Sequence, residues 1–253
     1  MTGGAGFDPV VAQATLYSSR NATRRWLHVA RREWVLNAVR KHAANRFSRA
    51  LEVGPGAGIY LPSLASSYER VTAFDRERVF LEHARALATR HPNLELVVGN
   101  ITECGMRTGA FQLILCSEVI EHVADSRSAL RELHRLLAPE GVLILTTPQR
   151  FSLLEQLSRI AYLPGVIRLV RWIYDEPVWD DGHVSLMTEG ELRHRLDEAG
   201  LAVVEQHKMG VYIPLVTEFG RAPALRLAKR LERRMQSGRL DWLLWTQCYV
   251  LRK

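Results

Sequence analysis

The feature that most constrains this chain is a glycine-rich turn that follows a short apolar run. Residues 51–58 read Leu-Glu-Val-Gly-Pro-Gly-Ala-Gly, and a helical stretch is expected at 58–67. Glycines let the backbone turn tightly and approach a ligand closely, and the first N–H groups of the next helix are free to bind it. The turn therefore predicts a nucleotide- or nucleoside-binding strand–turn–helix unit in an α/β sheet.

Short apolar runs with the length of buried strands recur along the first two thirds of the chain. They lie at 50–53, 71–74, 94–98, 111–116 and 142–147. Helical stretches are expected between them, at 58–67, 76–91 and 124–138. Short apolar strands that alternate with helices predict a parallel sheet covered by helices on both faces.

The segments outside this alternation add helices and two more strands. Residues 21–43 have apolar side chains at helical spacing, with arginines between them. An aromatic-rich insertion at 151–181 follows the fifth strand. A helix at 188–199 is then expected, with Thr188 as its N-cap and Gly200 at its end. A strand at 201–206, a basic helix at 222–236 and a final strand at the sequence CYVLRK complete the pattern.

Charge and cysteine content exclude several classes of protein. The 253 residues carry a net charge of +7, and the three cysteines have no CxxC spacing, which argues against a disulfide framework or a zinc knot. No signal peptide and no apolar run of about 18 residues is visible, so a cytoplasmic protein is expected. Basic side chains gather at 20–49 and 221–239. These flanks fit either anionic partners, such as lipid or nucleic acid, or an ordinary solvated helix face.

Two acidic residues indicate which nucleoside the turn binds. Asp75 lies 23 residues after Glu52, at the end of the next apolar run, where a carboxylate accepts hydrogen bonds from ribose hydroxyls. The turn has the spacing GxGxG, whereas a nicotinamide dinucleotide favours GxGxxG. The carboxylate of Glu52 would repel a pyrophosphate but suits a ligand with a sulfonium and an ammonium group.

As a set, these motifs resemble class I S-adenosylmethionine-dependent methyltransferases. The resemblance rests on EVGPGAG (52–58), Asp75, the Gly-Asn pair at 99–100 and SEVIEHV (117–123). SEVIEH and GHVSLMT (182–188) are similar to the small-molecule branch that includes ubiquinone-pathway O-methyltransferases. The resemblance implies a Rossmann-like, mostly parallel seven-stranded sheet with helices on both faces, an antiparallel last strand and a helical lid.

We divide the chain accordingly into four parts. These are an N-terminal helical cap at 1–47, a donor-binding core at 48–150, a lid at 151–187 that contacts substrate, and a C-terminal part of the core with an inserted basic helix at 188–253.

The resemblance also implies which residues bind S-adenosylmethionine. They are Tyr17, Glu52, Gly54, Gly56, Gly58, Asp75, Arg76, Asn100, Ile101, Ser117 and Glu118. Glu52 and the glycines would line the methionine end, and Asp75 the ribose. Arg76, Asn100 and Ile101 would lie at the adenine. The family more often has Asp at the position of Asn100, but the Asn side-chain oxygen can also accept from the adenine amine.

Two histidines are candidates for a catalytic base. Methyl transfer is an in-line displacement, and the protein mainly aligns the reactants and excludes water. A hydroxyl acceptor also needs a base. His122, after the fourth strand, is the first candidate and His183 the second; each is alternatively a structural histidine. Glu118, Glu121 and His122 would share one helical face and hold Mg²⁺, or Glu121 simply caps the following helix and no metal binds.

The remaining features concern the acceptor. An apolar insertion at 151–181 favours a small hydrophobic acceptor, or its apolar side chains simply pack into the core. Methylation on oxygen is expected, with carbon or nitrogen as the alternative atom. The basic helix at 222–236 suits peripheral contact with an anionic membrane, or it is an ordinary surface helix. No (N/D)PPY motif is present, so nucleic-acid methylation is not expected. A nicotinamide-dependent reductase and a nucleic-acid-binding protein are the alternatives from other classes.

Overall fold

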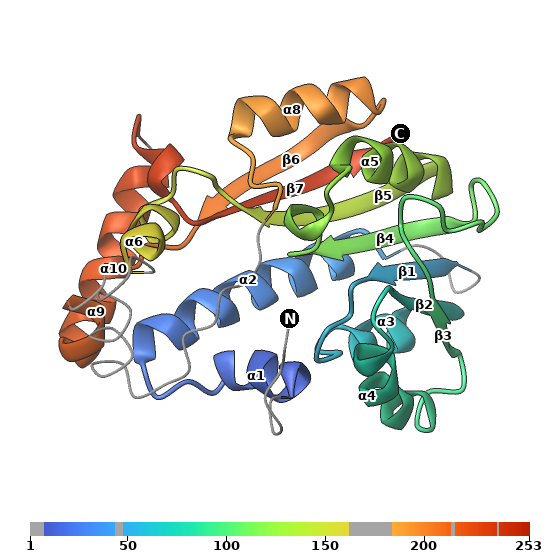
Figure 1. Cartoon of the computed structure of the whole chain (residues 1–253), viewed down its shortest axis with the longest axis horizontal. Helices are drawn as coiled ribbons and strands as arrows, with labels where there is room; N and C mark the ends of the chain where they lie inside the picture. Colours follow the sequence, from blue (N-terminus) through green and yellow to red (C-terminus); the bar gives the residue numbers. More distant parts are fainter. Residues whose placement is uncertain (1–7, 44–47, 162–183, 214–215, 237) are drawn as a thin grey trace.

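The computed structural model describes residues 8–43, 48–161, 184–213, 216–236 and 238–253, and places their strands in one seven-stranded sheet (Figure 1). The strands are β1 (Arg49–Val53), β2 (Arg70–Asp75), β3 (Leu94–Val98), β4 (Phe111–Ser117), β5 (Leu137–Pro148), β6 (Ala202–Met209) and β7 (Thr246–Arg252). Their order is β3-β2-β1-β4-β5-β7-β6, and β7 runs antiparallel to both of its neighbours. The predicted mostly parallel sheet with an antiparallel last strand is confirmed.

Helices cover both faces of this sheet (Figure 1). They are α1 (Pro9–Leu16), α2 (Ala22–Lys41), α3 (Leu61–Ser67), α4 (Arg78–Ala88), α5 (Ser126–Leu136), α6 (Leu153–Ala161), α8 (Glu189–Glu198), α9 (Val216–Phe219) and α10 (Arg221–Gln236), with 3₁₀ turns η1 (Ile120–His122) and η2 (Asp241–Leu243). On one face α2, α3 and α4 contact the strands, and on the other face α5 packs against β5 and α8.

The two helical layers explain why the strands are apolar throughout their length. Leu113 and Leu115 of β4 pack into the cluster that includes α2 and α3, whereas Ile114 and Cys116 pack into the cluster with α5 and α8. All four side chains are fully or almost fully buried. A strand buried on both faces loses the alternation of polar and apolar residues, and this produces the short apolar runs of the sequence.

The predicted helix boundaries follow from local capping. The Asn21 side chain accepts hydrogen bonds from the first turn of α2. Thr188 and Glu191 form a reciprocal capping box at the start of α8, and Gly200 ends that region with a φ of +76°. The roles of Thr188 and Gly200 were predicted from the sequence, because Thr satisfies free N–H groups and glycine accepts a left-handed backbone.

Some elements differ from the sequence-based expectation. Strand β5 begins at Leu137, five residues before the predicted start, because Leu137 already pairs with Phe111 of β4. The short helix α1 was not predicted. Within the insertion, α6 occupies the first predicted helical stretch, while 162–183 lie outside the described residues. Among the helices described, none is long and apolar enough to cross a membrane.

Candidate active site

The glycine-rich turn forms a left-handed loop after β1 and is covered by the N-terminal helix. Gly54, Gly56 and Gly58 have φ angles of +67°, +52° and +69°. A Cβ atom at Gly56 would overlap the Gln13 side chain of α1, and one at Gly54 would overlap Val119. Only glycine can adopt these positive φ angles and also leave room for the neighbouring side chains. Helix α1 therefore lies directly on the loop.

Glu52 is the most unusual charged group at this edge of the sheet. Its side chain comes from β1, the residue is 2% exposed, and Oε2 has no hydrogen-bond partner among the described residues. Burial raises the pKa of this carboxyl well above its ordinary value. A buried carboxylate without a partner destabilises the fold unless a cation neutralises it. The position fits the positively charged end of a ligand.

Asp75 ends β2 in the position that the sequence predicted. Burial raises the pKa of Asp75 to about 6, although the backbone N–H of Glu77, 2.8 Å from Oδ1, favours the ionised form. The carboxylate keeps free lone pairs for two neighbouring hydroxyl groups. Arg76 points its guanidinium toward Glu77, and its side chain is 75% exposed.

The residues after β3 present one polar and one apolar side chain. Asn100 is exposed, and its Oδ1 accepts a hydrogen bond from the backbone N–H of Thr102 at 3.2 Å. Ile101 is buried in the same cluster as Phe74 of β2. These side chains leave β3 beside Asp75, because β2 and β3 pair up to the register Asp75–Val98. The pair has the polarity expected for an adenine site.

At the end of β4 the chain makes a strained turn that orients a second carboxylate. Glu118 has a φ of +57°, which is uncommon for a residue with a side chain. Its backbone N–H donates to the Thr146 carbonyl at 2.9 Å, and its Oε1 accepts from the Thr146 hydroxyl at 2.9 Å. Ser117 shares the same hydroxyl at 2.9 Å. The end of β5 thus fixes the end of β4.

Arg31 is a site residue that the sequence analysis missed. This buried guanidinium of α2 donates to Glu118 Oε2 at 2.7 Å and lies 5.1 Å from the centre of the Trp245 ring. Burial alone would lower the pKa of Arg31, but Glu118, Tyr17 and Tyr60 together outweigh burial and raise the pKa, so the group stays charged. The sequence does contain one indication that Arg31 is buried. Arg31 lies four residues from both Leu27 and Val35, on the buried face of the helix.

The N-terminal segment closes over these groups. Burial, Arg31 and Arg24 lower the pKa of His28, so the neutral ring accepts the Arg31 guanidinium on Nδ1 at 3.3 Å. Tyr17 lies edge-on to His28, with ring centres 5.9 Å apart. Burial raises the pKa of Tyr60, and Tyr17, Arg31 and Glu52 are all close enough to shift it. The structure therefore brings the predicted Tyr17 to the Glu52 end of the site.

The proposed metal group is not assembled by the described residues. Glu118, Glu121 and His122 do not share a helical face, because Glu118 directly follows β4 and only a single 3₁₀ turn comes after it. Buried Glu121 accepts from the Thr147 hydroxyl at 3.0 Å, and its Oε1 is 4.0 Å from His122 Nε2. In the described ranges no three His, Cys, Asp or Glu side chains form a metal site, and His183 lies outside them.

The expected capping role of Glu121 is also absent. Asp125 caps α5 by accepting from the backbone N–H of Ser128 at 3.0 Å. The Glu121 carbonyl instead accepts from the N–H groups of Val184 and Ser185 at 3.0 and 2.9 Å. This contact places the end of the insertion beside η1. The imidazole of His122 is 42% exposed there, at the carboxyl edge of the sheet.

This fold and this arrangement of strand-end carboxylates and glycines define a class I S-adenosylmethionine-dependent methyltransferase. The chain belongs to the methyltransferase domain family, whose pattern matches residues 20–206. Ubiquinone biosynthesis O-methyltransferase of Erwinia tasmaniensis is 30% identical over 194 residues, which cover 75% of this chain and 76% of that one. A probable S-adenosylmethionine-dependent methyltransferase of Mycolicibacterium smegmatis is 28% identical over 162 residues, which cover 64% of this chain but 54% of that protein.

Solved structures share the fold at low sequence identity. A putative sarcosine dimethylglycine methyltransferase from Galdieria sulphuraria has a TM-score of 0.61 at 16% identity, covering 91% of this chain and 88% of that one. The N-methyltransferase NodS from Bradyrhizobium japonicum has a TM-score of 0.57 at 18% identity, covering 97% and 99%.

The residues of the site fit the methyl donor that the family implies. When bound, S-adenosylmethionine supplies an electrophilic methyl group on a sulfonium. Buried Glu52 would neutralise its positive charge, Asp75 would hold its ribose, and the loop of Gly54 to Gly58 would accommodate it without Cβ atoms. Arg31 is the buried cation that would attract its carboxylate.

Proposed function

We propose that this methyltransferase acts on an oxygen atom of a small, apolar acceptor. The observation that carries the proposal is the surroundings of His122 at the carboxyl edge of the sheet. The neighbouring segments expose two large apolar side chains, Phe151 at 45% and Val184 at 66%. Val184 is held to η1 through the Glu121 carbonyl, and Arg150, before Phe151, bonds to Met187. Exposed apolar side chains on segments bonded to the η1 turn and to Met187, together with an accessible imidazole, suit an apolar hydroxyl compound.

In this proposal the chain aligns the acceptor, excludes water and takes one proton. Two arginine–carboxylate ion pairs hold the surrounding segments in place. Arg31 pairs with Glu118 at the donor site, and Arg150 pairs with Glu191 at 2.6 Å beside the proposed acceptor site. His122 accepts the hydroxyl proton, which makes the acceptor oxygen a better nucleophile. His183 remains the second candidate for this base.

The relatives favour oxygen without excluding other atoms. The Erwinia tasmaniensis relative is an O-methyltransferase of ubiquinone biosynthesis, and three quarters of both chains align. Some proteins with the same fold methylate nitrogen or carbon. Transfer to carbon or nitrogen of a lipid or secondary metabolite is therefore the alternative, and acceptor choice decides between them.

Donor binding is tested first by calorimetric titration with S-adenosylhomocysteine. We expect saturable binding by the wild type and at least tenfold weaker binding by Asp75→Ala, since the ribose loses its acceptor. The exposed Glu103→Ala variant is a matched control that removes a carboxylate beyond Asn100 and should bind normally. Absence of binding, or binding of NADPH instead, would overturn the proposal.

The acceptor atom is tested with labelled donor and a paired set of alkyl-chain phenols and alkyl-chain amines. We expect methylated phenols, and a rate for His122→Gln about 100-fold lower at unchanged donor affinity, because general base catalysis contributes on this scale. Preferred transfer to the amines would favour the nitrogen alternative. A full rate in His122→Gln would assign the base elsewhere.

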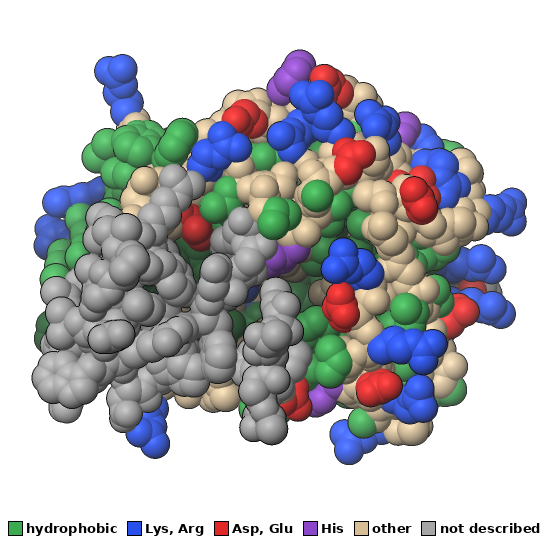
Figure 2. Space-filling view, in the orientation of Figure 1, with side chains coloured by type: hydrophobic (Ala, Val, Ile, Leu, Met, Phe, Trp, Pro, Cys, Tyr) green, Lys and Arg blue, Asp and Glu red, His purple; other side chains and the backbone are tan. Residues whose placement is uncertain are grey.

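We also propose that the surface around α10 makes peripheral contact with an anionic membrane. Ala224 and Ala228 of α10 are buried against the protein, contrary to the idea that the apolar face itself meets lipid. The outward side carries five basic residues: Arg226, Lys229, Arg230, Arg233 and Arg234. Leu240 and Trp242 are about half exposed just beyond the helix. Figure 2 shows an apolar patch with basic side chains beside it over this end of the molecule. This combination suits an anionic lipid surface.

A further inference from the structure

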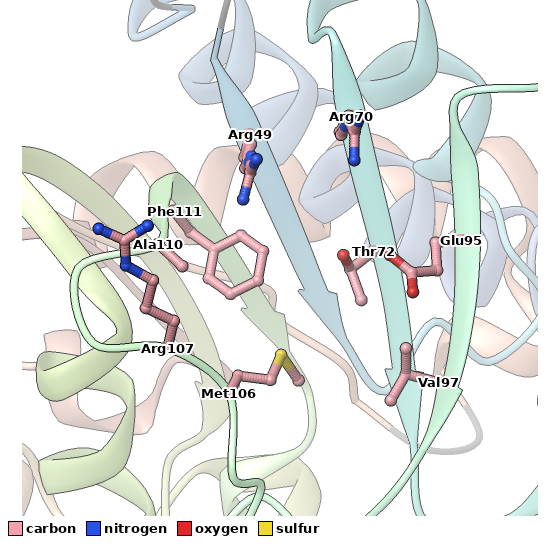
Figure 3. Close-up of a pocket in the computed structure, with 9 residues that line it drawn as sticks. All are labelled: Arg49, Arg70, Thr72, Glu95, Val97, Met106, Arg107, Ala110 and Phe111. Carbon is pink, nitrogen blue, oxygen red and sulfur yellow. The ribbon is translucent and has the colours of Figure 1, made fainter.

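A cavity of about 230 Å³ lies on the sheet at a distance from the donor site (Figure 3). It opens over β1, β2 and β3 on the face that carries α5 and α8, as shown by Phe111, which lines it and packs into that core cluster. Residues 99–110, between β3 and β4, form a loop without a helix. This stretch of sheet is therefore covered by a loop, and the loop leaves a hollow.

Three arginines are among the residues that line the hollow. Arg49 and Arg70 are register partners on the parallel strands β1 and β2, so both side chains leave the same face of the sheet. Arg107 approaches from the loop on the other side (Figure 3). Within the described part of the chain, none of the three side chains forms an ion pair or a hydrogen bond. Like charges on facing strand positions repel each other, and a bound anion would reverse this repulsion.

The loop that carries Arg107 is held in place from α5. The Arg135 guanidinium donates to the Met106 carbonyl at 2.7 Å and to the Thr108 hydroxyl at 2.8 Å, and Glu132 holds that guanidinium at 2.7 Å. The Gly109 N–H donates to the Arg135 carbonyl at 2.9 Å. The loop is thus organised in advance, so that little conformational entropy is lost when Arg107 binds a ligand.

The rest of the lining is mostly apolar. Phe111 turns its ring toward the hollow, Met106 lies near that ring, and Val97 lies across the hollow on β3 (Figure 3). The Thr72 hydroxyl and the Glu95 carboxylate are the other polar groups. The volume is below the range of about 300–1,000 Å³ that is usual for drug-sized ligands. It suits a molecule of one ring with a charged substituent.

We propose that this cavity binds a small organic anion, with its phosphate or carboxylate group on Arg49, Arg70 and Arg107 and its apolar part against Phe111 and Met106. The site is separate from the donor site, because Arg49 and Arg70 begin their strands whereas the donor residues Glu52 and Asp75 lie near the strand ends. The proposal does not depend on which acceptor the enzyme methylates.

The test is calorimetric titration of the full chain with phenyl phosphate, benzoate and inorganic phosphate at constant ionic strength. We expect saturable 1:1 binding, tighter for the aromatic anions than for inorganic phosphate, and the tighter of phenyl phosphate and benzoate identifies the preferred anionic group. Arg70→Gln and Arg107→Gln should each weaken binding about tenfold, the usual effect of losing a charge-assisted hydrogen bond. Arg85→Gln removes an exposed arginine of α4 and should bind like the wild type.

A second variant tests the apolar part of the cavity. Met106→Ala should weaken phenyl phosphate several-fold and leave inorganic phosphate unchanged, because only the ring contacts this side chain. Binding of S-adenosylhomocysteine at wild-type affinity shows that each variant is folded, and its failure in the wild type would overturn the proposed function alone. No saturation with any of the anions, or equal affinities in Arg107→Gln and Arg85→Gln, would overturn the anion site.

Discussion

At the scale of single residues, the site depends on charges that the fold itself does not neutralise. Buried Glu52 has an oxygen without a partner, whereas Glu118, one strand away, is fully engaged by Arg31 and Thr146. The two carboxylates therefore have different roles. The charge of Glu118 is already neutralised by Arg31 in the folded protein, whereas the charge of Glu52 is neutralised only when a cationic ligand binds. Such residues reduce stability in exchange for binding.

The first prediction concerns the loss of stability caused by the buried Glu52 carboxylate. Glu52→Gln should stabilise the unliganded protein by about 1–3 kcal/mol, which corresponds to a few degrees in Tm, because a buried charge is removed. Since the folded pKa of Glu52 is raised, the protonated carboxyl adds stability at low pH and this is lost as pH rises through that pKa. The advantage of the variant should therefore grow with pH in thermal unfolding.

The same variant should bind S-adenosylhomocysteine at least tenfold more weakly, since the ammonium group loses its counter-charge. Glu103→Gln changes an exposed carboxylate and serves as the control for both measurements. A Glu52→Gln protein with lower Tm and unchanged donor affinity would contradict this account of the residue.

The second prediction concerns the pH dependence of donor binding through Asp75. The pKa of about 6 means that acidification from pH 7.5 to pH 5 leaves about a tenth of this carboxyl ionised. Because only the carboxylate accepts from both ribose hydroxyls, the affinity for S-adenosylhomocysteine should fall about tenfold in calorimetry over this range. Asp75→Asn should bind weakly at both pH values with a shallower dependence. An equally steep dependence in the variant would assign the titration to another group.

At the scale of elements, helix α1 covers the glycine loop although it is only eight residues long. A helix of this length is not stable alone and relies on its cap and its packing. The Asp8 side chain accepts from the N–H groups of Val10 and Val11 at 2.8 and 3.3 Å, and Gln13 lies on Gly56. The cover of the donor site is therefore a locally weak element on a rigid sheet.

The third prediction tests whether helix α1 affects donor binding without affecting the stability of the core. Asp8→Ala should destabilise α1 by about 1 kcal/mol, the usual cost of losing an N-cap, and weaken donor binding several-fold with little change in global unfolding. Asp125→Ala removes the corresponding cap of α5 and should do the reverse, with lower Tm and normal donor affinity. Calorimetry and thermal unfolding of both variants check this, and equal effects of the two would contradict it.

At the scale of the whole molecule, the net charge of +7 is unevenly distributed over the fold. The basic residues of α2 lie partly in the interior, where Arg31 serves the site, and those of α10 lie outside. The N-terminal and C-terminal basic segments also pack together, since α2 contacts α9 and α10. The first part of α2, where Lys229 of α10 lies over the Trp26 ring, and helix α10 therefore lie on the same side of the molecule (Figure 1).

The fourth prediction tests this side against lipid. The protein should sediment with vesicles rich in phosphatidylglycerol, and binding should fall more than tenfold between 50 mM and 500 mM salt, because each basic residue near the surface contributes about 1 kcal/mol at low salt. Leu240→Asp combined with Trp242→Ser should reduce binding further. Val79→Asp, an exposed apolar position on α4, is the control. Equal sedimentation with neutral vesicles would contradict an electrostatic contact.

The sequence by itself determined the sheet and which carboxylates and glycines meet at its carboxyl edge. Glu52 and Asp75 were predictable because the carboxyl ends of parallel strands meet at one edge, so residues after successive apolar runs lie together. The caps at Asn21 and Thr188 are interactions within a few residues and leave a local signature. The candidate donor-binding residues at 52–58 and 117–118 come to this edge for the same reason.

Only the tertiary structure decided the contacts between distant segments. Arg31 reaches Glu118 across 87 residues, and nothing in the helix that carries it distinguishes it from its exposed neighbours except its position on the buried face. The candidate metal ligands Glu118, Glu121 and His122 do not meet on one helical face, because left-handed Glu118 and a single 3₁₀ turn follow β4 where a helix was expected. The cluster of Arg49, Arg70 and Arg107 likewise arises from strand register and loop placement. Local preferences specify elements, whereas pairing and packing over long separations specify which side chains meet.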